Sequence, residues 1–135
     1  MSRAIHMLEG IGPRYAQILK DAGVSTTEQL LQAGSTGKGR ADLARRTGLS
    51  LKLILKWVNM ADLFRVRGVA SQYAELLEAA GVDTVKELRN RNSDNLIEAM
   101  VKANAEKKLV RLLPNNKRVS SWIEHAKSLQ PVVTY

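Results

Sequence analysis

Near the amino terminus, a short glycine-rich segment carries the residues best suited to binding chemistry, Gly10-Ile11-Gly12-Pro13-Arg14. Glycines let the backbone of a turn come close to a ligand, and proline is tolerated at the first position of a helix. The amides that open such a helix point outward with the positive end of the helix dipole behind them, an arrangement that binds phosphate. The backbone at this segment is therefore suited to hold a phosphate.

A less complete version of this segment follows 58 residues later. Ala70 takes the place of the second glycine, and Ser71-Gln72 takes the place of the proline and arginine. Two arginines precede this second turn and a serine hydroxyl can donate to a phosphate, so we expect at most an auxiliary contact here. The residues that would form it are Arg65, Arg67, Gly68 and Ser71. The alternative for both segments is a purely structural turn, because a tight connection between helices needs glycine whether or not a ligand binds.

The charge of the chain favours an anionic partner. The 21 lysines and arginines outnumber the 13 aspartates and glutamates, which gives a net charge of +8, and nucleic acid is the first candidate for such a balance. The excess is shared equally, since residues 1–64 carry 9 basic and 5 acidic side chains and residues 65–135 carry 12 and 8. Basic residues expected to extend the first contact are Lys38, Arg40, Arg45, Arg46, Lys52 and Lys56, and a second group comprises Lys107, Lys108, Arg111, Lys117 and Arg118. The alternative is a solvated surface whose charge only maintains solubility.

Several classes of function lack the residues they need. Without cysteine the chain forms no disulfide or zinc–thiolate site and has no thiol nucleophile, and only His6 and His125 supply imidazole. We therefore expect no catalytic site, cofactor or metal. Gly37-Lys38-Gly39 shares glycines and a lysine with a phosphate loop, but a hydroxyl residue is missing after the lysine and no strand is expected before it. No apolar run approaches the roughly 20 residues that span a bilayer, and the start has no export signal, so we expect a cytoplasmic protein that does not enter the membrane.

An internal repeat indicates which elements must position these residues. Leu8–Leu30 and Val66–Leu88 align without gaps, with nine identical residues in 23. Trp57-Val58-Asn59-Met60-Ala61 matches Trp122-Ile123-Glu124-His125-Ala126 at a shift of 65, so the second half has gained seven residues. Within each copy the apolar residues recur at the i, i+3, i+4 and i+7 spacing of a helix. The chain is therefore predicted to be an all-α internal duplication, with the two tryptophans in its core.

Start and stop signals divide each half into short helices. The first begins near Pro13 and ends at Gly23, where a left-handed C-terminal cap is expected, and Gly81 is its counterpart. Capping boxes at Thr26 and Thr84 begin the next helix in each half. The first half continues with a loop over 34–39, a helix over 40–47 and a longer helix over 50–64. The second half continues with a helix from Asn92 or Ser93 to about Ala103, a break at 114–116 and a last helix that carries Trp122. No alternating pattern predicts a strand.

Leu8-Glu9-Gly10-Ile11-Gly12-Pro13-Arg14-Tyr15-Ala16 resembles the hairpin of the helix-hairpin-helix family, and the pattern Gly-Val-x-Thr-x-x-x-Leu at 23–30 and 81–88 is typical of tandem modules of that family. The chain is similar over nearly its full length to a bacterial family of unknown function built on two such copies. The resemblance implies an all-α, SAM-like fold of two tandem units, residues 1–64 and residues 65–135, the second with a degenerate hairpin. It also implies contact with a nucleic-acid backbone without sequence specificity, usually duplex DNA across its minor groove. In this chain the resemblance assigns that contact to Gly10, Ile11, Gly12 and Arg14.

Three other functions compete with this hypothesis. Ala44–Ser50, with Ile54, has the spacing of a DNA-reading helix-turn-helix, but the segment after it offers only Lys52 and Lys56 among apolar residues, whereas base recognition needs several polar side chains. The second is a protein–protein adaptor whose hairpins are structural, a role that members of the wider superfamily also serve. The third is an enzyme, which would need a carboxylate or histidine cluster that the spacing does not predict.

Overall fold

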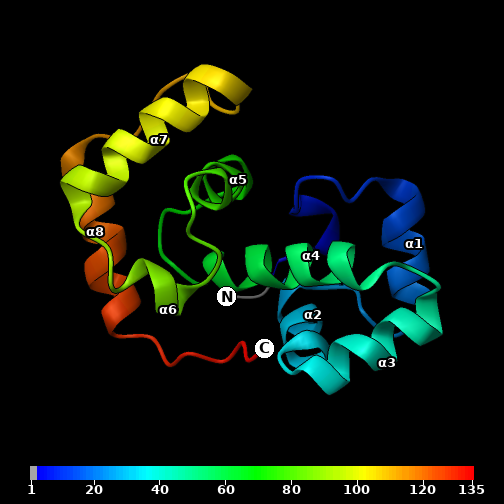
Figure 1. Cartoon of the computed structure of the whole chain (residues 1–135). Coiled ribbons are helices and arrows are strands. Elements are labelled where there is room, and N and C mark those ends of the chain that lie inside the picture. Colours follow the sequence, from blue (N-terminus) through cyan, green and yellow to red (C-terminus); the bar gives the residue numbers. More distant parts are fainter. Residues whose placement is uncertain (1–2) are drawn as a thin grey trace. The chain divides into compact units, whose positions relative to one another are not determined.

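The computed structural model describes residues 3–135, and within them the chain is helical (Figure 1). A short 3-10 helix and eight α-helices follow one another: η1 (Ile5–Met7), α1 (Pro13–Asp21), α2 (Thr27–Gly34), α3 (Gly37–Thr47), α4 (Leu51–Leu63), α5 (Ser71–Ala79), α6 (Val85–Leu88), α7 (Ser93–Lys107) and α8 (Asn116–Lys127). No strand forms in this part of the chain, where an isolated bridge pairs Ala4 with Thr26. The all-α prediction is confirmed.

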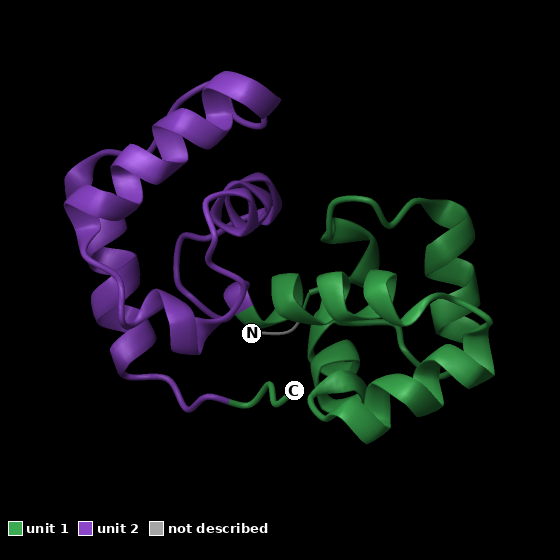
Figure 2. Ribbon diagram, in the orientation of Figure 1, with its two compact units in different colours: residues 1–62, 132–135 green, residues 63–131 purple. Residues whose placement is uncertain are grey.

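The helices divide into two compact units (Figure 2). Unit 1 comprises residues 1–62 and 132–135, and unit 2 comprises residues 63–131. The sequence-based division after residue 64 assigns the carboxyl terminus to the second half, whereas in the structure the last four residues belong to unit 1. The Thr134 amide donates to the Ser35 carbonyl oxygen at 2.7 Å, and the Val133 side chain is buried. These contacts attach the end of the chain to unit 1.

The first helix pair of unit 1 forms where the sequence predicts it. Pro13 is the first residue of α1 and Gly12 is its N-cap. Gly23 follows the helix with a φ of 85°, a conformation that favours glycine. The Thr26 side chain caps α2 by accepting from the Gln29 amide at 3.1 Å, and the Gln29 side chain accepts in return from the Thr26 amide at 3.2 Å. The capping box predicted at Thr26 is confirmed.

The second helix pair of unit 1 starts earlier than predicted. α3 begins at Gly37, within the segment expected to be a loop, because the Thr36 hydroxyl accepts from the Gly39 amide at 3.0 Å and caps the helix. Packing requires the second of these glycines, since a Cβ on Gly39 would lie 2.2 Å from the Ala33 carbonyl oxygen. The glycines on either side of Lys38 therefore belong to the start of a helix.

Unit 2 has the same order of helices with a longer third helix. α7 extends to Lys107, beyond the predicted end near Ala103. Asn92 and Asn115 cap α7 and α8 by accepting from the amides of residues 95 and 118. The capping box predicted at Thr84 is wrong, because the Thr84 hydroxyl donates to a carboxylate oxygen of Glu87 at 3.2 Å and caps no amide.

One tryptophan lies in the core of each unit. Trp57 is fully buried and Trp122 is 2% exposed, which confirms their prediction as core residues. The Trp57 ring meets the edge of the Tyr15 ring with 5.2 Å between centroids, and the Trp122 ring meets the Tyr73 ring at 5.4 Å. These contacts place α1 against α4 in unit 1 and α5 against α8 in unit 2.

Candidate functional site

The connection between η1 and α1, residues 8–14, is called the first hairpin here. A hydrogen bond from the Ile11 amide to the Leu8 carbonyl oxygen at 3.2 Å closes its turn, and both side chains are buried. Gly10 adopts a φ of 86°, which favours glycine, and a Cβ there would lie 3.7 Å from Nε1 of Trp57. The Ile11 side chain anchors the turn in the core and its amide closes the turn, so neither group of this residue is open to a phosphate.

The outer edge of the first hairpin is open to solvent. Gly12, Pro13 and Arg14 are exposed, no side chain caps α1, and the first turn of the helix contains no acidic residue. The bond from the Ala16 amide to the Gly12 carbonyl oxygen, at 2.9 Å, is the first of the helix, and the amides that precede it have no partner within the helix. One exposed carboxylate, Glu9, lies within the turn itself. The edge thus presents backbone donors, the positive end of the helix dipole and one arginine.

Gly12 differs from Gly10 because the fold does not require glycine there. Its φ of −82° is open to any residue, and a Cβ would meet nothing within 4 Å. In unit 2 the same N-cap position holds Ala70, with φ −90° and ψ 175° against −82° and −175° at Gly12. Close approach of a ligand is therefore a physical reason for a glycine at position 12 that packing does not supply.

The second hairpin, residues 66–72, retains the turn of the first. Its glycine, Gly68, has a φ of 90°, and the Val69 amide donates to the Val66 carbonyl oxygen at 3.1 Å. A Cβ on Gly68 would lie 3.1 Å from Nε1 of Trp122, closer than at Gly10. The Ser71 hydroxyl, which the sequence suggests as a donor to phosphate, is buried and has no hydrogen-bond partner among the described residues. It therefore lies away from the surface on which that contact was expected.

The two arginines before the second turn have different surroundings. Arg65 is half-buried, and its guanidinium donates to the Gln130 carbonyl oxygen at 2.7 Å. Arg67 has an exposed side chain, while its amide donates to Nδ1 of His125 at 2.9 Å and holds the turn against α8. Arg67 is therefore more exposed to solvent than Arg65.

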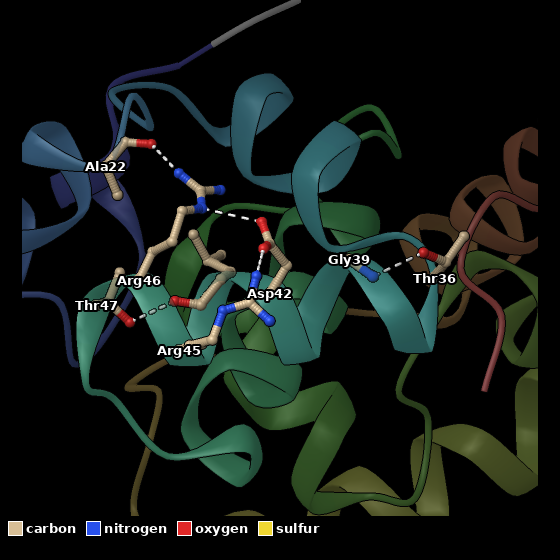
Figure 3. A network of polar contacts seen from close by, with 8 residues as sticks. Ala22, Thr36, Gly39, Asp42, Arg45, Arg46 and Thr47 are labelled. Atoms are coloured by element: carbon tan, nitrogen blue, oxygen red, sulfur yellow. Dashed lines mark hydrogen bonds and ion pairs between the residues drawn. The ribbon is translucent and has the colours of Figure 1, made fainter.

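Arg45 and Arg46 lie at the end of α1 opposite the first hairpin. Arg46 donates to the carbonyl oxygen of Ala22, the C-cap of α1, at 2.9 Å, and both arginines pair with Asp42 (Figure 3). The nine residues of α1 separate this cluster from Gly12 by about 14 Å at the usual rise of a helix. The Arg45 side chain is 77% exposed, and exposed ion pairs contribute little free energy, so these pairs do not prevent contact with a phosphate.

Arg40 must be removed from the predicted basic surface. Its side chain is buried, with only 5% of the residue exposed. The guanidinium donates to the carbonyl oxygens of Gly34 at 2.8 Å and Thr134 at 2.6 Å, and it lies 5.7 Å from the centre of the Tyr135 ring. Arg40 therefore holds the carboxyl terminus against unit 1. Lys38, two residues earlier in α3, remains exposed.

A shallow groove runs beside α1 and extends the candidate site. Its lining includes Pro13 of the first hairpin together with two side chains that the sequence analysis did not select for binding, His6 and Lys20. Both are exposed. Lys20 belongs to α1 itself, whereas His6 comes near the hairpin through the packing of η1 against α1, which the local sequence pattern does not reveal.

The helix that would act as the recognition helix of a helix-turn-helix is largely packed into unit 1. α4 buries Ile54 and Trp57 completely, and its exposed polar side chains in the first two turns include Lys52 and Lys56. Two lysines make a surface suited to phosphates rather than to base edges.

Residues 3–135 provide neither a metal-binding cluster nor a membrane-spanning helix. They bring together no group of three or more histidine, aspartate or glutamate side chains able to hold a metal ion. None of the helices in residues 3–135 combines the length and apolar character needed to cross a membrane.

Comparison with known proteins gives a family but no individual relative. No curated protein and no solved structure matches the chain. Residues 9–129 match DUF4332, a domain of unknown function. This match covers both hairpins and most of the helical chain, and the protein therefore belongs to the DUF4332 family.

Proposed function

We propose that the protein binds the phosphate backbone of nucleic acid, with duplex DNA as the first candidate, and does so without reading base sequence. The observation that carries the proposal is the open edge of the first hairpin. There an uncapped helix start and the exposed Arg14 lie beside Gly12, a glycine that the fold does not require. A phosphate oxygen can approach the backbone at such an edge and accept hydrogen bonds from it.

The proposal includes the interpretation of the chain as two tandem helix-hairpin-helix units. Similar features in the two units support it. Each hairpin has a glycine with positive φ, Gly10 or Gly68, placed against the indole nitrogen of the buried tryptophan of its unit. Each tryptophan also meets the tyrosine that follows the turn.

Cations around α1 supply the electrostatic part of the proposed interaction. Arg14 stands at the amino-terminal end of the helix, Lys20 lines the groove beside it, and Arg46 bonds to its carboxyl-terminal end. If each of these neutralises one phosphate, the logarithm of the binding constant falls with the logarithm of salt concentration with a slope of about −2.7. Unit 2 adds to this slope, because it carries 12 basic and 8 acidic side chains.

The decisive experiment gives the first hairpin the sequence of the second. The double variant Gly12→Ala/Arg14→Gln introduces the residues that unit 2 carries at these positions, Ala70 and Gln72. Fluorescence anisotropy with a labelled 20-base-pair duplex, over a salt series, should show binding weakened about tenfold, since a charge-assisted contact and the backbone approach are lost together. The fold should be retained, because alanine already occupies the same backbone conformation in unit 2.

A matched control removes one positive charge elsewhere. Lys127 is exposed and pairs with Glu124 at 3.1 Å, so Lys127→Gln should weaken binding by less than twofold, as expected for an exposed paired charge. Absence of duplex binding by the unmodified protein at low salt would refute the proposal. Equal weakening by the double variant and the control would also contradict it, because the effect would then follow net charge and not the hairpin.

The protein–protein adaptor remains the alternative function. The largest exposed apolar side chains come from different parts of the fold, Met7 of η1, Leu51 of α4, Val101 of α7, Leu112 of the α7–α8 loop and Tyr135. An adaptor would be favoured if the anisotropy experiment gave no binding to duplex, single-stranded or branched probes.

A further inference from the structure

We propose that Arg118 provides unit 2 with a phosphate contact of its own, held over the second hairpin by two aromatic rings. This inference rests on the proposed function and extends it to a residue outside both hairpins. When the two halves of the chain are aligned with each other, each has an arginine at a position where the other has none. Gln72 stands where the first hairpin has Arg14, and Arg118 stands where α4 has Leu53. Unit 2 thus lacks the arginine on its hairpin helix and carries one on α8 instead.

The contacts of Arg118 place it beside the second hairpin. Its guanidinium carbon lies 4.9 Å from the centre of the Tyr73 ring and 5.7 Å from that of Trp122. These are the two rings that pack together in the core of unit 2. Nε1 of Trp122 in turn lies against Gly68, the glycine of the turn. Stacking on aromatic rings restrains a guanidinium and leaves its edge free to donate hydrogen bonds.

The hydroxyl of Tyr73 fixes the orientation of Arg118 further. It donates to the Leu112 carbonyl oxygen at 3.2 Å, and its oxygen accepts from a guanidinium nitrogen of Arg118 at 3.3 Å. Leu112 belongs to the loop over 108–115, which has eight residues, whereas the corresponding loop of unit 1 over 48–50 has three. The longer loop of unit 2 therefore supplies the acceptor that aligns the tyrosine hydroxyl with the arginine.

Arg118 is available to a ligand. The residue is exposed, and it forms no ion pair within residues 3–135. One of its five N–H donors is used by the Tyr73 hydroxyl, so most of the planar fork can receive the oxygens of a phosphate. A carboxylate of α7, Asp94, accepts from the Asn116 side chain of the same turn at 2.6 Å.

The position of Arg118 within its helix supports a binding role. Lys117 and Arg118 lie in the first turn of α8, which contains no acidic residue. Positive charges at this end of a helix are unfavourable, because they face the positive end of the helix dipole. Departures from local preference of this kind are expected where function requires them. Asn115 already caps this helix start by accepting from the Arg118 amide at 2.9 Å, so a phosphate here would be held by the Arg118 side chain, with the helix dipole in support.

The test compares replacement of Arg118 with replacement of the first hairpin, in the full-length protein and with the same duplex and salt series. We expect Arg118→Ala to weaken binding about five- to tenfold and to make the salt slope shallower by about 0.9, as for the loss of one phosphate contact. Arg118→Lys should retain the slope and recover part of the affinity, because lysine keeps the charge but not the stacked fork. Tyr73→Phe should weaken binding about two- to threefold, because it keeps the ring and removes the hydroxyl that orients the arginine.

The outcomes distinguish this inference from the proposed function. Failure of the unmodified protein to bind nucleic acid would overturn both. Weakening by Gly12→Ala/Arg14→Gln, combined with Arg118 variants that bind no worse than Lys127→Gln, would overturn the Arg118 contact alone. Circular dichroism melting checks that each variant is folded, and if Arg118→Ala unfolds, Arg118→Lys and Tyr73→Phe decide by the same criteria. Inorganic phosphate gives a second readout. If the unmodified protein and Arg118→Ala bound phosphate with similar affinity, and also bound the duplex with equal affinity, the Arg118 contact would be contradicted.

Discussion

The first and second hairpins have the same aromatic pair beneath the turn. A tyrosine from the helix after the turn packs against a tryptophan from the last helix of the unit. The two hairpins differ in the residues at the start of the helix that follows the turn. The first hairpin has Gly12 and Arg14 at an open helix start, and the second has Ala70 and Gln72. A glycine in such a turn can serve the fold or, as we propose for Gly12, the approach of a ligand, and a related turn in the same chain helps to distinguish the two.

The fold requires glycine at positions 10 and 68. Both have φ near 90°, and both lie where a Cβ would approach an indole nitrogen. The fold does not require glycine at position 12, since its counterpart Ala70 shows that a side chain is compatible with the turn. The geometry that the two turns share therefore serves folding, and we propose that the difference between them concerns binding.

The largest expected effect is on stability and tests the buried tryptophan of each unit. Trp57→Ala and Trp122→Ala should each destabilise the protein by about 3–5 kcal/mol, because a large, buried aromatic side chain is removed and a cavity remains. Urea denaturation followed by circular dichroism measures both. Similar losses are expected, since the two tryptophans are buried to the same extent. A loss below about 1 kcal/mol for either would contradict its placement in a packed core.

A smaller effect separates the two structural glycines. Gly10→Ala should cost about 1–2 kcal/mol for placing a side chain at positive φ. Gly68→Ala should cost more, because its Cβ would lie 3.1 Å from Nε1 of Trp122, against 3.7 Å from Trp57 at Gly10. The same denaturation experiment measures the difference, and Gly12→Ala is the matched control that should change the stability by less than about 0.5 kcal/mol. If Gly12→Ala proved as damaging as Gly10→Ala, the division into structural and binding glycines would fail.

Much of the fold follows from local signals in the sequence. Proline after Gly12, the capping pair of Thr26 and Gln29, and the left-handed Gly23 mark the ends of the first two helices, and each acts within a few residues. The tryptophans were predicted as core residues because they recur at corresponding positions among apolar neighbours. Such features need no knowledge of distant contacts.

The features that sequence analysis missed depend on distant parts of the chain. Arg40 is buried because the carbonyl oxygen of Thr134, 94 residues later, accepts from it. Arg118 stacks on Tyr73, which is 45 residues earlier. The start of α3 was missed for a different reason, since glycines predict a loop unless a cap such as Thr36 and close packing at Gly39 favour the helix. Charge and composition identify cations but not which of them the fold buries.

The smallest expected effect comes from the reverse exchange, which gives the second hairpin the residues of the first. Ala70→Gly/Gln72→Arg should tighten duplex binding about three- to fivefold and make the salt slope steeper by about 0.9, because one cation is added beside an uncapped helix start. The gain should be smaller than the loss from the opposite exchange, since Ser71 still stands where the first hairpin has Pro13. Anisotropy titrations over the salt series provide the measurement.

The matched control for this gain is Ala105→Arg, which adds the same charge at an exposed position of α7 in unit 2. If both variants tightened binding equally, the second hairpin would have gained only charge, and its geometry would not matter. If the double variant tightened binding and the control did not, a cation next to a glycine at a helix start would be sufficient to restore the contact. The difference between the two hairpins would then reside in two residues, on a turn whose remaining geometry is the same in both units.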